Sequence, residues 1–150
     1  MRDAQMSCMS KSIPRVQKYM STAPHSIGRA QPLRVAHAMM HEHHIRHLPV
    51  LEGGRLVGIL TERDVGLITS MMDASERDTT VEEAMTTDVY AVSPEALLDE
   101  VASEMAERKY GSAVVLQNQK VVGIFTTVDA CRALSELLRE RLATPGSRGA

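Results

Sequence analysis

Threonine and aspartate stand three residues apart at two places in the chain, as Thr61 with Asp64 and as Thr126 with Asp129. Each pair follows an apolar run containing Gly-Ile, where the glycine lets another group approach the backbone. A helix is expected to start at each threonine, and its free amides would suit a phosphate. The same spacing also forms a capping box, in which the two side chains bond the first amides of the helix. Because capping and binding are compatible, we interpret both pairs as parts of ligand sites.

These pairs belong to an internal repeat. Residues 16–64 and 81–129 align without a gap at a constant offset of 65, so that Val16 falls on Val81. A fixed long period indicates one supersecondary unit that is used twice. One unit is too short to bury its apolar face alone. We therefore expect the two copies to pack around a pseudo-two-fold axis, with duplicated residues facing each other across a cleft.

Each copy predicts the order β-α-β-β-α. A short extended piece at Ile27 or Val92 precedes the first helix. In the second copy this helix has Ser93 as its N-cap, Pro94 at its first position and Gly111 as its stop signal. The first strand should pair in parallel across the helix, and the next two strands should form an antiparallel hairpin. The last helix follows each hairpin, and the expected hairpin strands are residues 47–51, 56–60, 113–116 and 121–125.

Three features together resemble a known family: the Pro-Val within His47–Val50, the Gly-Ile-x-Thr-x-x-Asp that closes each copy, and the tandem pairing. They resemble cystathionine-β-synthase-type (CBS) domains, a pair of which is called a Bateman module. The resemblance covers about residues 16–135 and implies a stand-alone module without a catalytic domain. It implies an α/β (α+β) fold of two β-α-β-β-α repeats with pseudo-two-fold symmetry. The expected boundaries are an arm at 1–14, CBS motifs at 15–72 and 81–140, a linker at 73–80 and a tail at 141–150.

The resemblance also implies roles for the duplicated residues. The hydroxyls of Thr61 and Thr126 would contact phosphate, and the carboxylates of Asp64 and Asp129 would each accept both hydroxyls of a ribose. The segments that lead into the two copies would touch the base or the phosphate through Thr22 and Thr87. Plain loop hydroxyls are the alternative interpretation of these two threonines. The apolar slot for the base would come from Ile27, Pro49, Val92 and Val114.

Cations are distributed unequally between the copies. Arg46 and His47 stand just before the second strand of the first copy, and Arg63 stands beside Asp64. The family often carries basic residues here that reach phosphates, so the clefts should differ and polyphosphate should prefer the cleft of the first copy. Solvated surface charge is the alternative. The equivalent positions in the second copy are Gly111, Ser112 and Val128, of which Ser112 is retained as a candidate contact.

Five of the six histidines lie within residues 37–47. His37, His41 and His44 would share one helix face at a spacing that can bind a divalent metal. Apart from Glu42, no cysteine or acidic partner completes a recognised pattern nearby. We therefore favour a polar helix face at or near a dimer contact and predict no metal site.

Composition excludes several classes of protein. The net charge is −2, which gives no basic excess for nucleic acid. No apolar run approaches the roughly 18 residues of a membrane span, and no signal peptide is expected. Cys8 and Cys131 suggest reduced thiols in a cytoplasmic protein. No arrangement of residues indicates catalysis, so we do not expect an enzyme.

The sequence therefore predicts a regulatory module that binds AMP, ADP or ATP between its two motifs and signals by a change in conformation. No cofactor is required for this role. The alternatives are binding of S-adenosylmethionine or NAD, a structural adaptor without ligand, and a metal sensor based on the histidines. The expected partners are a regulated protein that the sequence does not identify and a second copy of the chain. The homodimer would use apolar helix faces that contain Met39, Met40, Met71, Met72, Leu134, Leu137 and Leu138.

Overall fold

A computed structural model of the chain describes residues 12–71 and 79–143. Most of the expected arm, linker and tail therefore lies outside the described residues. The first repeat contains η1 (Val16–Lys18), β1 (Ser21–Thr22), β2 (Ile27–Gly28), α2 (Leu33–His43), β3 (His47–Glu52), β4 (Arg55–Thr61) and α3 (Glu62–Met71). The second repeat contains α4 (Val81–Ala84), β5 (Ala91–Val92), α5 (Leu98–Arg108), β6 (Ser112–Gln117), β7 (Lys120–Thr126) and α6 (Thr127–Ala143).

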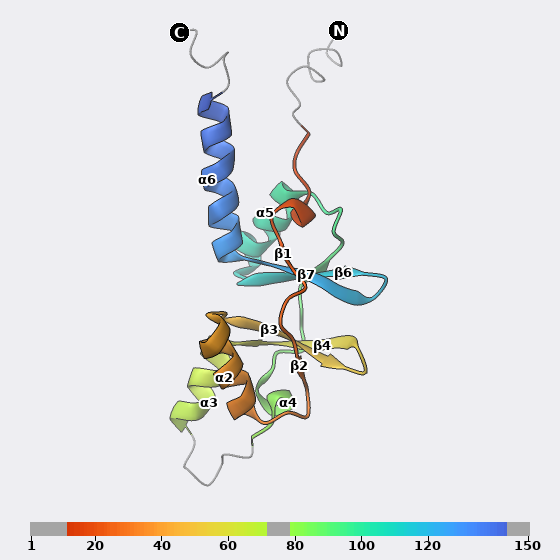
Figure 1. Cartoon of the computed structure of the whole chain (residues 1–150), viewed down its shortest axis with the longest axis vertical. Helices are drawn as coiled ribbons and strands as arrows, with labels where there is room; N and C mark the ends of the chain where they lie inside the picture. The colour runs from red at the N-terminus through yellow and green to blue at the C-terminus, as the bar shows by residue number, and fades with distance from the viewer. Residues whose placement is uncertain (1–11, 72–78, 144–150) are drawn as a thin grey trace.

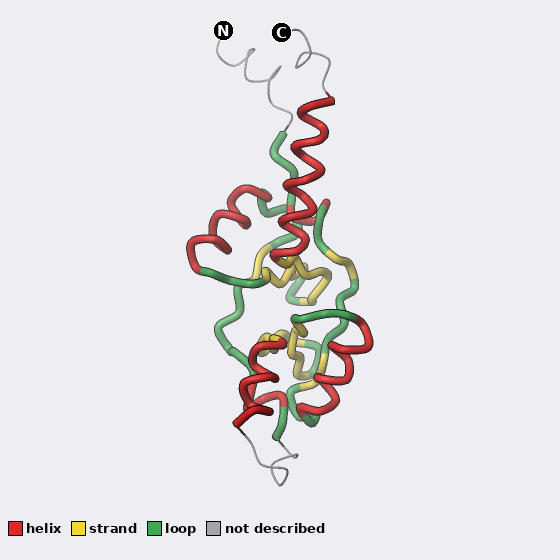
Figure 2. Tube along the Cα trace, turned by 90° about the vertical axis from the view of Figure 1, so that its left-hand side faces the viewer, coloured by secondary structure: helices red, strands yellow, loops and turns green. Residues whose placement is uncertain are grey.

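The strands form two sheets that face each other in the middle of the molecule, with the helices outside (Figures 1 and 2). One sheet has the order β2-β3-β4 and the other has the order β1-β7-β6-β5. The pairs β2–β3 and β5–β6 are parallel, whereas β3–β4 and β6–β7 are antiparallel, as expected. A buried cluster of Ile59, Val114 and Ile124 joins the two sheets. The α/β fold with duplicated β-α-β-β-α units is confirmed.

Both hairpins turn through two residues with positive φ. These are Gly53 and Gly54 in the first repeat, and Asn118 and Gln119 in the second. Positive φ at both central positions matches the right-handed twist of the flanking strands. The predicted hairpins are thus confirmed, with strands that are one or two residues longer than expected.

The expected ends of α5 are wrong. The amide of Glu95 donates to the Ser93 hydroxyl at 3.2 Å, and the amide of Ala96 donates to the Ser93 carbonyl at 3.0 Å, so these residues form a turn. The helix begins at Leu98, whose amide donates to the carbonyl of Pro14 at 2.9 Å. The leading segment of the first repeat therefore occupies the place where the helix was expected to start.

The other helix ends also differ from expectation. Lys109, in the left-handed conformation at φ 59°, ends α5 in place of Gly111, and His44 ends α2 in the same way at φ 54°. Both last helices begin one residue later than expected, because each capping threonine still belongs to the preceding strand. Helix α6 continues to Ala143 and so includes three residues that the sequence assigned to the tail.

Each leading segment packs on the other repeat rather than on its own. Val16 is buried with Val101 and Phe125 of the second repeat, while Val81 is buried in the core of the first. Strand β1 pairs with β7, and Thr86 forms the equivalent bridge to Ile59 in β4. Figure 1 shows η1 and β1 in the half that holds α5 and α6, and α4 in the half that holds α2 and α3. The repeat in sequence is therefore not the packing unit in space.

The apolar faces proposed for a homodimer are only partly exposed. Met40 is buried in the first core, and Met39 and Leu137 pack against the cores. Met72 lies outside the described residues. Leu134, Leu138 and Leu142 follow one another at four-residue spacing along α6 and are 59%, 51% and 72% exposed. Among the described helices, none combines the length and the apolar character that crossing a membrane requires.

Candidate functional site

Two clefts lie where the sheets meet the N-termini of α3 and α6. Cleft one surrounds Thr61 and Asp64 and has a volume of about 580 Å³. Cleft two surrounds Thr126 and Asp129 and has a volume of about 500 Å³. Both volumes suit a small organic ligand, since such sites span roughly 300–1,000 Å³.

Each cleft takes residues from both repeats. Thr86 and Lys109 of the second repeat line cleft one. Ser21, Thr22 and Arg46 of the first repeat line cleft two. The exchange of the leading segments causes this mixing, because it places Ser21 beside β7 and Thr86 beside β4. A ligand in either cleft would therefore touch both motifs.

Both Thr-x-x-Asp motifs form capping boxes. In cleft one, the Thr61 amide donates to Asp64 Oδ2 at 3.1 Å, and the Asp64 amide donates to Thr61 Oγ1 at 3.1 Å. The equivalent bonds of Thr126 and Asp129 measure 2.9 and 3.3 Å. Each carboxylate is thus held in the lining of a cleft by the first turn of its helix. The capping role is confirmed, and it positions the side chains for which we expect a second role.

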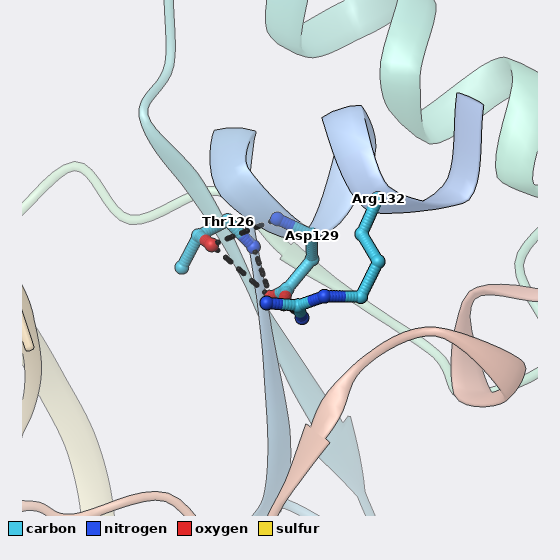
Figure 3. Close-up of polar contacts among 3 residues, drawn as sticks. All are labelled: Thr126, Asp129 and Arg132. Carbon is cyan, nitrogen blue, oxygen red and sulfur yellow. Dashed lines mark hydrogen bonds and ion pairs between the residues drawn. The ribbon is translucent and has the colours of Figure 1, made fainter. Parts of the chain in front are cut away.

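The carboxylate in cleft two has additional internal partners. Figure 3 shows Asp129 between Thr126 and Arg132. The Thr126 hydroxyl donates to Oδ2 at 3.1 Å, and the Arg132 guanidinium donates to Oδ1 at 3.1 Å. Asp129 is 4% exposed, whereas Asp64 is only half-buried. The two duplicated carboxylates therefore have different surroundings.

The cations predicted for the first copy meet in cleft one. The lining of cleft one contains Arg46, His47, Arg63 and Lys109. Arg46 Nε lies 3.6 Å from Glu62 Oε2. The cationic lining is not confined to cleft one, because Arg46 lines both clefts. The sequence assigned these cations to the cleft of the first copy, whereas each cleft also takes side chains from the other repeat.

His47 lies between the two clefts. A Cβ at Gly111 would be 2.8 Å from His47 Nε2, so the absence of a side chain at this position makes room for the imidazole. Burial and then the nearby Arg46 lower the pKa of His47 below its ordinary value of 6.5, although Asp64 and Glu62 oppose the shift. The ring is therefore mainly neutral at pH 7, and it supplies a hydrogen-bonding group rather than a fixed charge.

Some predicted contacts do not lie in the clefts. Neither Thr87 nor Ser112 is among the lining residues. Thr86, which makes the bridge to β4, takes the place expected for Thr87. The residues proposed as a slot for the base do not line either cleft: Ile27, Val92 and Val114 belong to the hydrophobic cores or pack against them, and Pro49 is fully buried.

Several lining residues were not predicted from the sequence. Lys109 lines cleft one, and its counterpart His44 lines cleft two, together with His25. Lys109 and His44 are the left-handed residues that end α5 and α2. His44 and Lys109 are 65 residues apart, which is the offset of the repeat. This equivalence was the signal in the sequence that could have identified them as duplicated positions.

Among residues 12–71 and 79–143, no three metal-binding side chains are grouped around a common point. His37, His41 and His44 instead border a hollow of about 260 Å³ beside Arg46. His43 stacks on His25, with ring centroids 3.8 Å apart and planes inclined by 13°. This stack joins the end of α2 to the loop after β1.

Comparison with known proteins identifies the family. A family model described as CBS domain matches residues 16–65 and 81–136. The chain is 30% identical over 116 residues to the CBS domain-containing protein YhcV of Bacillus subtilis. This alignment covers 76% of this chain and 81% of YhcV. A crystal structure from Vibrio cholerae, of a protein assigned to acetoin utilization (AcuB), matches with a TM-score of 0.79 and 31% identity over 89% of this chain and 99% of that one.

A third relative was solved with ligands. The CBS domain pair of protein MJ0100, in complex with 5′-methylthioadenosine and S-adenosyl-L-methionine, has a TM-score of 0.75 and 28% identity. The match covers 83% of this chain and 98% of the MJ0100 chain. Together with the duplicated fold and the paired clefts, these matches show that the chain belongs to the CBS domain family as a tandem pair of CBS motifs.

Proposed function

We propose that this chain is a regulatory module that binds an adenine nucleotide, AMP, ADP or ATP, in the clefts between its two motifs. The observation that carries the proposal is the repeated construction of the clefts. Each one combines a capping box from one repeat with the leading segment of the other. A carboxylate held in this way can accept bonds from two ribose hydroxyls, and the first turn of the helix offers a positive dipole end to phosphate.

The lining of cleft one favours phosphate over a cationic ligand. Arg46, Arg63 and Lys109 outnumber the acidic side chains, Glu62 and Asp64. A guanidinium can bind two phosphate oxygens at once. S-adenosylmethionine carries a positive sulfonium, which gains nothing from these residues. The related MJ0100 pair was solved with S-adenosyl-L-methionine, so this ligand is the second candidate, and the number of phosphates is the variable that separates the two.

The position of the clefts also suggests how binding would be signalled. Because both repeats line each cleft, an occupied cleft restrains one repeat relative to the other. A ligand shifts a conformational equilibrium only if it binds one arrangement more tightly. The regulatory role therefore requires two arrangements of the motifs, and a partner protein would recognise one of them.

Calorimetry of the purified chain with AMP, ADP, ATP and S-adenosylmethionine tests the proposal. We expect nucleotide binding that weakens in Asp64→Asn, because the neutral amide is a poorer acceptor for the ribose hydroxyls. Asp99→Asn, on the exposed side of α5, is the matched control and should bind as the wild type does. If none of the four compounds binds, the ligand-free adaptor replaces the present proposal. If S-adenosylmethionine binds more tightly than the three nucleotides, it replaces the adenine nucleotide as the proposed ligand.

A further inference from the structure

The two duplicated carboxylates differ in what occupies their second oxygen. In cleft two, Asp129 Oδ2 accepts two bonds from Thr126, and Oδ1 accepts a bond from Arg132. In cleft one, Asp64 Oδ2 accepts the Thr61 amide, and no group of the described residues bonds to Oδ1. The cause lies three residues along each helix. At the offset of 65, the position equivalent to Arg132 is Leu67, which has no hydrogen-bond donor.

We propose that Arg132 restricts ribose binding to cleft one by occupying the Asp129 carboxylate. This inference rests on the proposed function and names the residue that makes the duplicated clefts unequal. A vicinal diol needs two acceptor positions on one carboxylate. Within the described part of the chain nothing bonds to Oδ1 of Asp64, whereas both oxygens of Asp129 are already bonded within the protein (Figure 3). A ribose in cleft two that uses both oxygens of Asp129 must first displace the guanidinium from Oδ1.

The surroundings of Arg132 make this role separable from folding. Its side chain is 68% exposed, while the carboxylate that it bonds is 5% exposed. The guanidinium therefore covers a buried acceptor from the solvent side without forming part of a hydrophobic core. Replacing it by leucine reproduces the side chain of the first repeat and leaves the Thr126–Asp129 capping bonds in place. We expect Arg132→Leu to fold normally.

Adenosine is the decisive probe because it has the ribose but no phosphate. If Arg132 acted by binding phosphate, its removal would weaken AMP and leave adenosine unchanged. If it covers Asp129, its removal should strengthen adenosine binding in cleft two. An Asp64→Ala background isolates that cleft, since it removes the carboxylate of cleft one.

The experiment compares adenosine binding by calorimetry in Asp64→Ala and in Asp64→Ala with Arg132→Leu. We expect the second protein to bind on the order of fivefold more tightly, which corresponds to about 1 kcal/mol of binding free energy. The reverse exchange, Leu67→Arg in the otherwise wild-type chain, should weaken binding in cleft one by a similar factor. Arg139→Leu removes an exposed cation elsewhere on α6 and should change neither value. Far-UV circular dichroism checks that every variant is folded.

The outcomes separate this inference from the proposed function. Equal or weaker adenosine binding after Arg132→Leu in the Asp64→Ala background overturns the role of Arg132, even where the wild type binds nucleotide. Tighter binding supports that role. If neither the wild type nor any variant binds adenosine or AMP, both the proposed function and the role of Arg132 are wrong.

Discussion

The thioether of Met85 lies directly over Gly58 in the strand of the other repeat. A Cβ at Gly58 would be 2.5 Å from the Met85 sulfur and 3.0 Å from the Thr86 carbonyl oxygen. Met20 and Gly123 repeat this contact across the pseudo-two-fold axis. The glycine in each Gly-Ile-x-Thr-x-x-Asp motif therefore makes room for the leading segment of the partner repeat. The close approach that the sequence suggested is filled by methionine.

Gly58→Ala should destabilise the chain. The added methyl group overlaps both a side chain and a backbone oxygen, and overpacking of this kind costs about 1–3 kcal/mol. Gly66→Ala in α3 is the matched control, because a Cβ there meets nothing within 4 Å. Alanine should stabilise that helix position by about 0.5–1 kcal/mol. Urea unfolding measures both changes, and an unaltered midpoint for Gly58→Ala would contradict the close contact.

Loss of a capping hydroxyl should lower stability without abolishing the fold. Thr126→Ala removes the acceptor of the Asp129 amide and one donor to its carboxylate. We expect a loss of about 1 kcal/mol in the free energy of unfolding, as for other N-cap threonines. Thr126→Ser keeps the hydroxyl and should remain close to the wild type. A loss of equal size in both variants would assign the effect to the methyl group instead.

His47 should contribute a pH dependence to stability. Its pKa is lowered in the folded chain, so just below pH 6.5 the unfolded chain binds more protons than the folded one. Stability from this residue is therefore present above pH 6.5, decreases as the pH falls below that value, and levels off once the folded His47 is also protonated. His47→Gln should show a smaller loss between pH 7 and pH 5. Parallel pH curves for the two proteins would contradict the lowered pKa.

The arginines of cleft one should distinguish ATP from AMP. Changing Arg46 and Arg63 to alanine should weaken ATP more than AMP, because AMP offers fewer phosphate oxygens to the guanidinium groups. Arg63 gives the sharper single variant, since Arg46 also lines cleft two. Arg34→Ala, on the exposed side of α2, controls for loss of net charge. Titrations at one fixed salt concentration make the comparison valid, and equal losses for ATP and AMP would leave these residues as solvated surface charges.

A homodimer should form through the apolar stripe of α6. Leu134, Leu138 and Leu142 share one side of the helix and are all more than half exposed. Contiguous exposed apolar surface of this kind marks an interface. Light scattering at tens of micromolar should give the mass of two chains, and Leu138→Lys should shift it towards one chain. Glu136→Lys, on a different side of α6, should leave the mass unchanged. A wild-type monomer at that concentration would rule out the stripe as a dimer interface.

The repeat, the hairpins and the capping boxes could be predicted because their signals are local. Gly53-Gly54 sits between two apolar runs, and Thr126 stands three residues before Asp129. The exchange of leading segments could not be predicted in this way. Ser21 pairs with Ile124 of the second repeat. Because Ile59 is the equivalent residue of the first repeat, the sequence is equally compatible with a pairing of Ser21 with Ile59. Only the lengths of the connections and the packing of the whole molecule decide between these alternatives.

The sequence also contains a local signal for the inequality of the clefts, at the positions three residues after each aspartate. Arg132 is three residues after Asp129, a spacing at which opposite charges meet on a helix surface. Leu67 is three residues after Asp64. Arg46 and Arg63 differ in charge from their counterparts in the cleft lining, whereas Arg132 and Leu67 differ in whether they can bond the carboxylate itself.

The reciprocal placement of Val16 and Val81 has a consequence for the origin of such a chain. A single repeat would present an unfilled core and an unpaired edge of its last strand, while its leading segment would extend away to pack on another copy. Two identical copies would complete each other by domain swapping. Joining them end to end replaces a concentration-dependent association by an intramolecular one, with an effective concentration on the order of millimolar. Once the halves are covalently joined, one carboxylate can acquire a neighbouring arginine while its twin keeps a leucine, and a symmetric assembly becomes a module with two different sites.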